Sequence, residues 1–217
     1  MPEIPNSIIE AFATVGARLA ASNLISGRSG NLSIRTPDRH DLIITTRGAN
    51  CAKLGAETLV AVGPDSKVIE GQGDPSTELP LHRAIYEARA DVGAIIHTHP
   101  IFATVIAALH SEIPPFIDEL IPAVGGTVAT ARYGYPCSDD LARNAVAALE
   151  DKQAVLLANH GAVGVGTNLD EALGVCEVVE RAAQILVYTR LLGGPFDLNP
   201  KMVARQKAVF KRSHRKR

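Results

Sequence analysis

Histidines at two distant points of the chain are the side chains best suited to metal chemistry. His97 and His99 flank Thr98 in a His-Thr-His-Pro run, and His160 lies between Asn159 and Gly161. Three neutral imidazoles can bind Zn²⁺ and leave one coordination position open for a substrate. A His-x-His pair alone is equally compatible with a structural role, so the hypothesis depends on His160 reaching the same point in space.

A carboxylate and two hydroxyls precede the first histidine pair. Ser76 and Thr77 end a turn-rich segment and are expected to cap a helix that runs to about Ala90, and Glu78 is expected in its first turn, on the same face as His82. The free N–H groups of a helix start attract anions. Glu78 is either a functional carboxylate or one that only stabilises the helix dipole.

Two glycine-containing loops each carry an arginine. Arg28 lies in residues 26–30 with Gly30, and Arg47 precedes Gly48. Glycine allows a backbone to approach a ligand closely, and loop N–H groups together with a guanidinium suit a phosphate or carboxylate. The alternative is that both loops are ordinary hairpin turns with solvated arginines.

The elements that must position these residues are short apolar strands. Residues 92–96 predict a buried strand that carries His97 and His99 to its end, where Pro100 stops the ladder. Residues 154–158 predict a second buried strand, which delivers His160. Side chains two apart on a strand share a face, so His97 and His99 can present two imidazoles to one point.

The remaining pattern alternates strands with helices, and several strands pair as hairpins. An α/β fold is therefore expected, in which helices flank a mixed sheet. The expected strands are residues 31–35, 41–46, 59–62, 68–70, 127–131 and 162–166. The expected helices are residues 6–23, 101–109 (buried), 138–150, 169–192 and 200–212. Asp118 and Glu119 lie among apolar neighbours, where a carboxylate must be paired, exposed or functional.

Composition predicts one globular domain over residues 1–217. The chain is 46% hydrophobic and 21% charged, with a net charge of −1 that argues for neither nucleic acid nor an anionic membrane as a partner. Residues 211–217 carry five positive charges and are expected to be a disordered basic tail. The three cysteines have no metal or disulfide spacing. Without a basic segment before Arg18 or a membrane-spanning apolar run, a cytoplasmic protein is expected.

Four motifs in this order resemble the class II aldolase/epimerase family over about residues 6–192. They are residues 30–33 (Gly-Asn-Leu-Ser), 75–78 (Pro-Ser-Thr-Glu) with His82, 97–99 (His-Thr-His) and 159–161 (Asn-His-Gly). The resemblance implies a three-layer α/β/α fold around a largely antiparallel sheet. It also implies a C4 homotetramer with active sites between subunits.

The resemblance also implies roles for individual residues. His97, His99 and His160 match zinc ligands, although Mn²⁺, Co²⁺ or Fe²⁺ also accept imidazole. Glu78 matches a carboxylate that acts as acid/base and can complete the metal shell. The implied phosphate-binding positions are Gly30, Asn31, Arg47, Gly48, Ser76 and Thr77. The metal would stabilise the charge that develops when the C3–C4 bond of a ketose 1-phosphate breaks, and Glu78 would protonate the resulting carbon.

The expected products are dihydroxyacetone phosphate and an aldehyde, from a substrate such as L-fuculose 1-phosphate or a deoxypentulose 1-phosphate. Some members place a tyrosine of a neighbouring subunit near the aldehyde, where this sequence has Asp118 and Glu119. These carboxylates and Arg28 are thus possible secondary substrate contacts. A 4-epimerase, decarboxylase or dehydratase of a sugar phosphate would use the same metal, and a non-enzymatic scaffold domain would lack the histidines that are present here.

Overall fold

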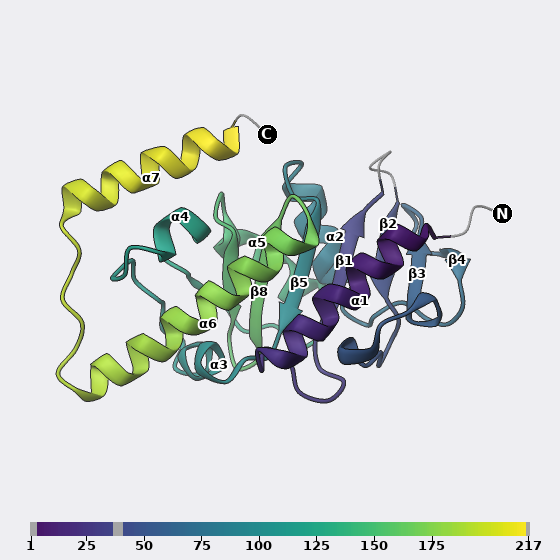
Figure 1. Ribbon diagram of the computed structural model, residues 1–217, viewed down its shortest axis with the longest axis horizontal. Coiled ribbons are helices and arrows are strands. Elements are labelled where there is room, and N and C mark those ends of the chain that lie inside the picture. Colours follow the sequence, from purple (N-terminus) through teal and green to yellow (C-terminus); the bar gives the residue numbers. More distant parts are fainter. Residues whose placement is uncertain (1–3, 37–40, 216–217) are drawn as a thin grey trace.

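A mixed sheet of eight strands forms the centre of the computed structural model, which describes residues 4–36 and 41–215 (Figure 1). The strand order is β4-β3-β2-β1-β5-β8-β7-β6. Every neighbouring pair is antiparallel except β6 and β7, which are parallel. The α/β fold with a largely antiparallel sheet is thereby confirmed.

The bounds of the regular elements follow the apolar pattern of the sequence closely. The strands are β1 (Asn31–Arg35), β2 (Leu42–Thr45), β3 (Leu59–Val62), β4 (Val68–Gly71), β5 (Ala94–Thr98), β6 (Thr130–Ala131), β7 (Ala154–Leu157) and β8 (Gly161–Gly166). The helices are α1 (Asn6–Ala21), α2 (Leu79–Ala88), α3 (Ile101–Ala108), α4 (Leu120–Val124), α5 (Asp139–Leu149), α6 (Leu169–Leu191) and α7 (Pro200–Arg215).

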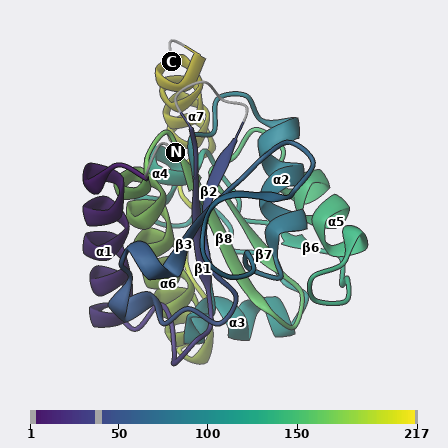
Figure 2. The same ribbon diagram turned by 90° about the vertical axis from the view of Figure 1, so that its right-hand side faces the viewer.

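Helices cover both faces of the sheet, which gives the three layers expected. Helices α1 and α6 lie on one face, and α2 and α5 lie on the other (Figure 2). Strand β5, at the centre, is buried along its whole length. Successive β5 residues pack into the hydrophobic cores on opposite faces of the sheet. Ile96 packs with Phe12 and Leu173 under α1 and α6, whereas Ile95 packs with Ile85 and Leu141 under α2 and α5. The strand that carries His97 is therefore held from both sides.

Helix α2 begins later than the sequence pattern predicted. Its N-cap is Glu78, without a side-chain cap hydrogen bond, so the expectation that Ser76 or Thr77 is the cap is wrong. Pro80 explains the shift, because proline favours the first turn of a helix, where no N–H partner is needed. Glu78 consequently sits at the junction of loop and helix.

Three further elements differ from the predicted pattern. Helix α3 is not fully buried, because Ile101 and Leu109 are 67% and 66% exposed. Strand β6 has only two residues, and α4 was not predicted, since prolines at 114, 115 and 122 obscure its apolar periodicity.

The C-terminal segment is helical where a disordered tail was expected. Helix α7 continues through residues 211–215, held at Phe210, which packs against Gly125. Residues 216–217 of the basic tail and the turn expected at 37–38 lie outside the described residues. Among the described residues, no helix combines the length and apolar character required to cross a membrane. The expectation of a single domain stays a prediction.

Candidate metal and catalytic site

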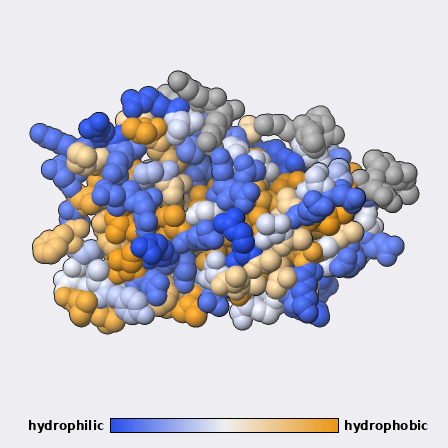
Figure 3. Space-filling view, in the orientation of Figure 1, coloured by the Kyte–Doolittle hydropathy of each residue, from blue (hydrophilic) through white to orange (hydrophobic). Residues whose placement is uncertain are grey.

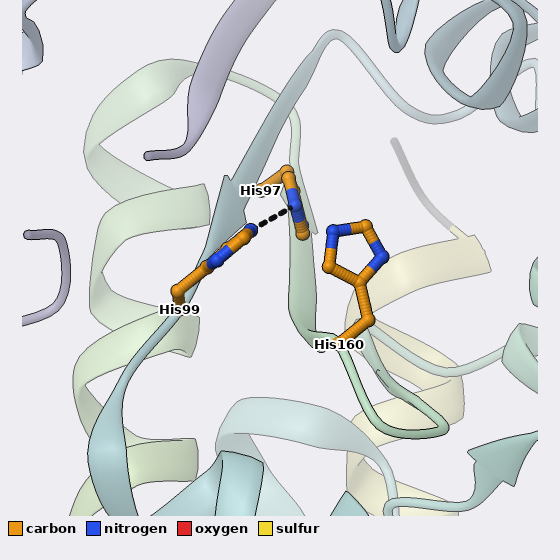
Figure 4. Close-up of side chains that lie close together, drawn as sticks. All are labelled: His97, His99 and His160. Carbon is orange, nitrogen blue, oxygen red and sulfur yellow. Dashed lines mark hydrogen bonds between the residues drawn. The ribbon is translucent and has the colours of Figure 1, made fainter. Parts of the chain in front are cut away.

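The three histidines singled out in the sequence converge on one point. Their ring centroids are 4.7 to 4.8 Å apart, and one nitrogen of each lies within 4.8 Å of the others (Figure 4). His97 and His99 come from the end of β5, and His160 comes from the turn before β8 (Figure 4). Within the described residues this is the one group of three or more such side chains with metal-ligand spacing.

The pairing of two neighbouring strands brings the histidines together. His97 lies opposite Val163, and Thr98 lies opposite Ala162, in the antiparallel β5–β8 ladder. A Cβ atom at Gly161 would lie 2.3 Å from the Thr98 carbonyl oxygen and 3.4 Å from His97 Cε1. Gly161 therefore permits the close approach of the His160 turn to the end of β5.

Hydrogen bonding and burial prepare the imidazoles for a cation. The Nδ1–H of His97 donates to the Ala162 carbonyl at 3.0 Å, which leaves Nε2 with its lone pair, 2.8 Å from His99 Nε2. Burial lowers the pKa of His97 far below its ordinary value, lowers that of His99, and lowers that of His160 to about 4. All three are neutral near pH 7, which is the state that binds metals.

Glu78 completes the cluster. Its carboxylate oxygens lie 3.4 Å from His97 Nε2 and 3.5 Å from His160 Nε2. Glu78 is buried, and its Oε2 has no hydrogen-bond partner in the part of the chain that the structure describes. An orphaned buried carboxylate oxygen beside three neutral imidazoles fits a divalent cation. Burial also raises the pKa of Glu78 to about 7, which suits a group that must both give and take a proton near neutral pH.

The residues expected to bind phosphate lie on segments that meet beside this cluster. Asn31 is the β1 partner of His97, and a Cβ at Gly30 would lie 2.7 Å from the His97 carbonyl oxygen. The segment before α2 joins the end of β2, because Arg47 N donates to the Asp74 carbonyl and Ser76 N donates to the Thr45 carbonyl, both at 2.9 Å. The structure thus gathers the Gly30, Arg47 and Ser76 segments, while their binding of phosphate stays a prediction.

The two arginines lie on adjoining loops. Gly48 has a left-handed backbone (φ 69°), and a Cβ there would lie 3.7 Å from Arg28 Nη1. Arg28, Arg47 and Thr77 are exposed, whereas Ser76 is buried and its Oγ accepts from Glu78 N at 3.3 Å. Ser76 therefore also orients the start of the segment that carries Glu78.

Asp118 and Glu119 point to other partners. Asp118 accepts from Gln206 on α7 at 3.0 Å, and Glu119 pairs with Arg181 on α6 at 2.8 Å. These contacts satisfy the requirement that carboxylates among apolar residues be paired or exposed. A secondary substrate contact through them stays a prediction.

Supporting residues that the sequence pattern missed lie behind the histidines. The Glu180 carboxylate on α6 accepts from Phe102 N and Ala103 N at 2.9 and 2.8 Å, so it caps α3 directly after His99 and Pro100. Asn159 Oδ1 lies 2.6 Å from His110 Nε2, and both residues have left-handed backbones. These contacts cross between distant segments, which no local sequence pattern reports.

Known proteins with named activities match this chain over most of its length. A 5-deoxy-D-ribulose 1-phosphate aldolase of Bacillus thuringiensis is 35% identical over 86% of this chain and 87% of its own. A 5-methylthioribulose-1-phosphate/5-deoxyribulose-1-phosphate aldolase of Rhodospirillum rubrum is 36% identical over 85% of this chain and 82% of its own. A solved structure of an L-fuculose 1-phosphate aldolase superposes with a TM-score of 0.90 at 31% identity, covering 96% of this chain and 98% of that one.

The model of one protein family spans most of the chain. Its match covers residues 10–187, which include Glu78 and all three histidines. This extent, together with the relatives above, places the chain in the family described as Class II Aldolase and Adducin N-terminal domain.

Proposed function

We propose that this protein is a zinc-dependent aldolase that cleaves a ketose 1-phosphate to dihydroxyacetone phosphate and an aldehyde. Class II aldolase activity on a sugar phosphate follows from the family and the named relatives. The observation that carries the proposal is the convergence of His97, His99 and His160 beside the buried Glu78. A non-enzymatic scaffold domain would not require three neutral imidazoles beside Glu78, whose buried Oε2 has no hydrogen-bond partner among the described residues.

In the proposed reaction, His97, His99 and His160 would hold a divalent metal ion through their ring nitrogens. A divalent ion bound there supplies Lewis-acid stabilisation of negative charge on the substrate oxygens. Glu78 transfers the proton at the carbon that becomes C3 of dihydroxyacetone phosphate, giving it in cleavage and removing it in condensation. Burial raises the pKa of Glu78 to about 7, and a cation bound beside it would lower that pKa, so the two effects oppose each other.

The phosphate of the substrate is proposed to bind at the Gly30, Asn31, Arg47, Gly48, Ser76 and Thr77 positions. The segments that carry these residues lie side by side around the start of α2. An anion held at that point would fix which carbon faces Glu78, and such orientation contributes strongly to rate. Arg28, next to Gly48, would provide a second guanidinium, beside that of Arg47, to bind the phosphate.

A 5-deoxypentulose 1-phosphate is the substrate that the named relatives favour, with L-fuculose 1-phosphate as the second candidate. The two curated relatives reported above act on deoxyribulose phosphates, and the solved structure is of an aldolase for fuculose phosphate. These sugars share the C1 to C3 portion that becomes dihydroxyacetone phosphate. They differ in the aldehyde, so the choice between them is made at the aldehyde end of the site.

We further propose a homotetramer located in the cytoplasm. Apolar side chains are exposed on α3 and at the end of α6, and Figure 3 shows hydrophobic side chains toward the end of the molecule where α6 ends. All three cysteines are free thiols, as expected in a reducing compartment.

The test is a substrate screen with the metal content controlled. Ketose and deoxyketose 1-phosphates are incubated with the protein, and dihydroxyacetone phosphate is detected through a coupled reaction. Activity should vanish on chelation and return with Zn²⁺, and His97→Ala should lose both metal and activity. Acidic sugar phosphates assayed for carbon dioxide test the decarboxylase alternative, and carbon dioxide release without dihydroxyacetone phosphate would overturn the aldolase assignment.

A further inference from the structure

A chain of buried hydrogen bonds runs behind the proposed phosphate site. His82 Nε2 lies 2.5 Å from Asn31 Oδ1, and His82 Nδ1 lies 2.6 Å from Ser33 Oγ. Ser33 Oγ lies in turn 2.9 Å from Tyr86 OH. All four side chains are buried, and His82 is fully enclosed. Both ring nitrogens of His82 are therefore committed to protein partners.

The chemistry of these groups fixes the direction of each hydrogen bond. Asn31 Oδ1 can only accept, so His82 Nε2 carries the proton. His82 is neutral, since burial lowers its pKa to about 3, and Nδ1 must then accept the Ser33 hydroxyl hydrogen. Ser33 Oγ is left to accept from Tyr86 OH. The protons therefore run in one direction, from Tyr86 through Ser33 and His82 to Asn31.

The end of this chain lies beside the metal cluster. Asn31 is the antiparallel partner of His97, so the two side chains stand next to each other on the face of the sheet that α2 covers. His82 lies on α2, one turn after Glu78. The hydrogen bond to Oδ1 leaves the Asn31 NH₂ group as the end that can donate to a ligand.

We propose that His82 is a positioning residue, whose Nε2–H holds Asn31 Oδ1 so that the Asn31 amide donates to the phosphate of the substrate. This proposal rests on the proposed function for the identity of the substrate. It adds a residue that contacts neither metal nor substrate. Without the His82 N–H, Asn31 Oδ1 would be a buried acceptor with no donor. An amide that turned to find another donor for its oxygen would move its NH₂ group away from the phosphate and lose that hydrogen bond.

A packing role alone predicts different behaviour. If His82 contributed only packing, replacing it with leucine would weaken phosphate binding no more than replacing it with glutamine. If it acts through its Nε2–H, glutamine should restore function, because its amide NH₂ can donate from the same place, whereas leucine cannot.

The first experiment compares His82→Leu with His82→Gln in the metal-loaded protein. For His82→Leu, we expect the KM for the ketose 1-phosphate and the Kd for inorganic phosphate, read by phosphorus NMR titration, each to rise about tenfold. The kcat should change by less than about threefold, and metal content should be unchanged. His82→Gln should recover most of both losses. Equal losses in the two variants, or no loss in either, would overturn the proposal.

The second experiment asks whether His82 acts through Asn31. Asn31→Ala should raise the KM and the phosphate Kd by a similar factor, and adding His82→Leu to it should cause no further rise. Independent, multiplying effects would overturn the proposal. Tyr86→Phe is the matched control, because Ser33 can still donate to His82 Nδ1, and the KM should stay within about twofold of the parent value.

A third measurement covers the case in which a variant does not fold. Nitrogen NMR of the wild-type protein with labelled histidine should show His82 protonated at Nε2 at neutral pH, and a proton on Nδ1 would overturn the proposal. The outcomes separate from those of the proposed function. If no ketose 1-phosphate were cleaved, the aldolase assignment would be wrong. The tautomer of His82 and the phosphate titration would still test the proposed role of His82 and Asn31.

Discussion

Burial sets the protonation states of the individual side chains at the site. The same enclosure that keeps His97 and His160 neutral raises the pKa of Glu78 to about 7. Desolvation disfavours every charged form, so a base loses its proton more easily and an acid keeps it longer. The result is a set of uncharged ligands beside a carboxyl group that is half ionised near neutral pH.

Glu78→Gln should therefore separate proton transfer from metal binding. The glutamine keeps the shape of the side chain but cannot exchange a proton, so cleavage should fall by about 10² to 10⁴-fold. Zinc should still bind through the three histidines. The measurement is hydrogen exchange at C3 of dihydroxyacetone phosphate together with metal content. Exchange at the parent rate would show that another group moves the proton.

The same substitution should change how the stability of the metal-stripped protein depends on pH. The Glu78 carboxyl ionises near pH 4.5 in the unfolded chain and near 7 in the folded chain. The folded state thus binds the proton more tightly, and stability falls as the pH rises from about 4.5 through 7. Above pH 8, Glu78→Gln should exceed the parent by up to ~3 kcal/mol in free energy of unfolding, measured with urea. An equal advantage at pH 5 would rule out this cause.

At the scale of elements, two close approaches hold the histidines in place. One is the contact of Gly161 with the end of β5, and the other is the cap that Glu180 provides for α3. Each can be tested against a residue on the same fold that lacks the contact.

Gly161→Ala should disrupt the site, because its Cβ would lie 2.3 Å from the Thr98 carbonyl oxygen. The backbone at Thr98 would have to move, and because Thr98 lies between His97 and His99, both imidazoles would be displaced. Zinc affinity should therefore fall by at least about tenfold. Gly174→Ala is the control, since a Cβ in that position on α6 meets nothing within 4 Å. It should raise stability by about 0.5 to 1 kcal/mol through helix propensity. Unchanged zinc affinity in Gly161→Ala would contradict the argument.

Glu180→Ala should lower the free energy of unfolding by about 1 to 2 kcal/mol, because two N–H groups at the start of α3 lose a charged acceptor. The control is Glu177→Ala, one turn away on α6, where the contact with Arg18 is 3.5 Å long and exposed. That change should cost less than about 0.5 kcal/mol. Urea unfolding of both variants provides the comparison, and equal losses would argue against a capping role.

Local pattern was sufficient to predict most of the elements, because β5, β7 and β8 are apolar runs and because α5 and α6 begin within one residue of the predicted positions 138 and 169. It also marked the three histidines, since each follows an apolar strand. It was not sufficient for the Asn31–His82 contact or for Glu180, because these depend on how a helix lies across a strand or on another helix. The start of α2 differs from the prediction because Pro80 occupies the first turn of the helix, although Ser76 and Thr77 have the higher capping propensity.

At the scale of the whole molecule, the exposed apolar residues are unevenly distributed. Leu191, Leu192 and Phe196 are 77%, 87% and 96% exposed at the end of α6, and Ile101 and Leu109 are exposed on α3. Figure 3 shows hydrophobic side chains at that end of the molecule. A concentration of exposed apolar side chains is typical of an interface between copies of a chain.

This surface supports self-association, and under the homotetramer proposed above the 23.0 kDa chain should sediment as four copies. Leu192→Glu should weaken assembly, because it places a charge where an apolar side chain is covered in the oligomer. Sedimentation velocity at micromolar concentration is the measurement, with the exposed Lys53→Glu as a control for added negative charge. A parent protein that remains monomeric would contradict the assignment of this surface.

The separation of the ligands along the chain has a consequence for biosynthesis. His97 and His99 leave the ribosome well before His160, and β8, one of the two strands that pair with β5, follows His160. A nascent chain that stops at α5 carries two of the three imidazoles, on a strand that can pair with β1 but not yet with β8. Zinc loading should therefore begin only after β8 has been translated and has paired with β5, and ribosome-bound chains of increasing length would reveal the step at which the ion is first retained.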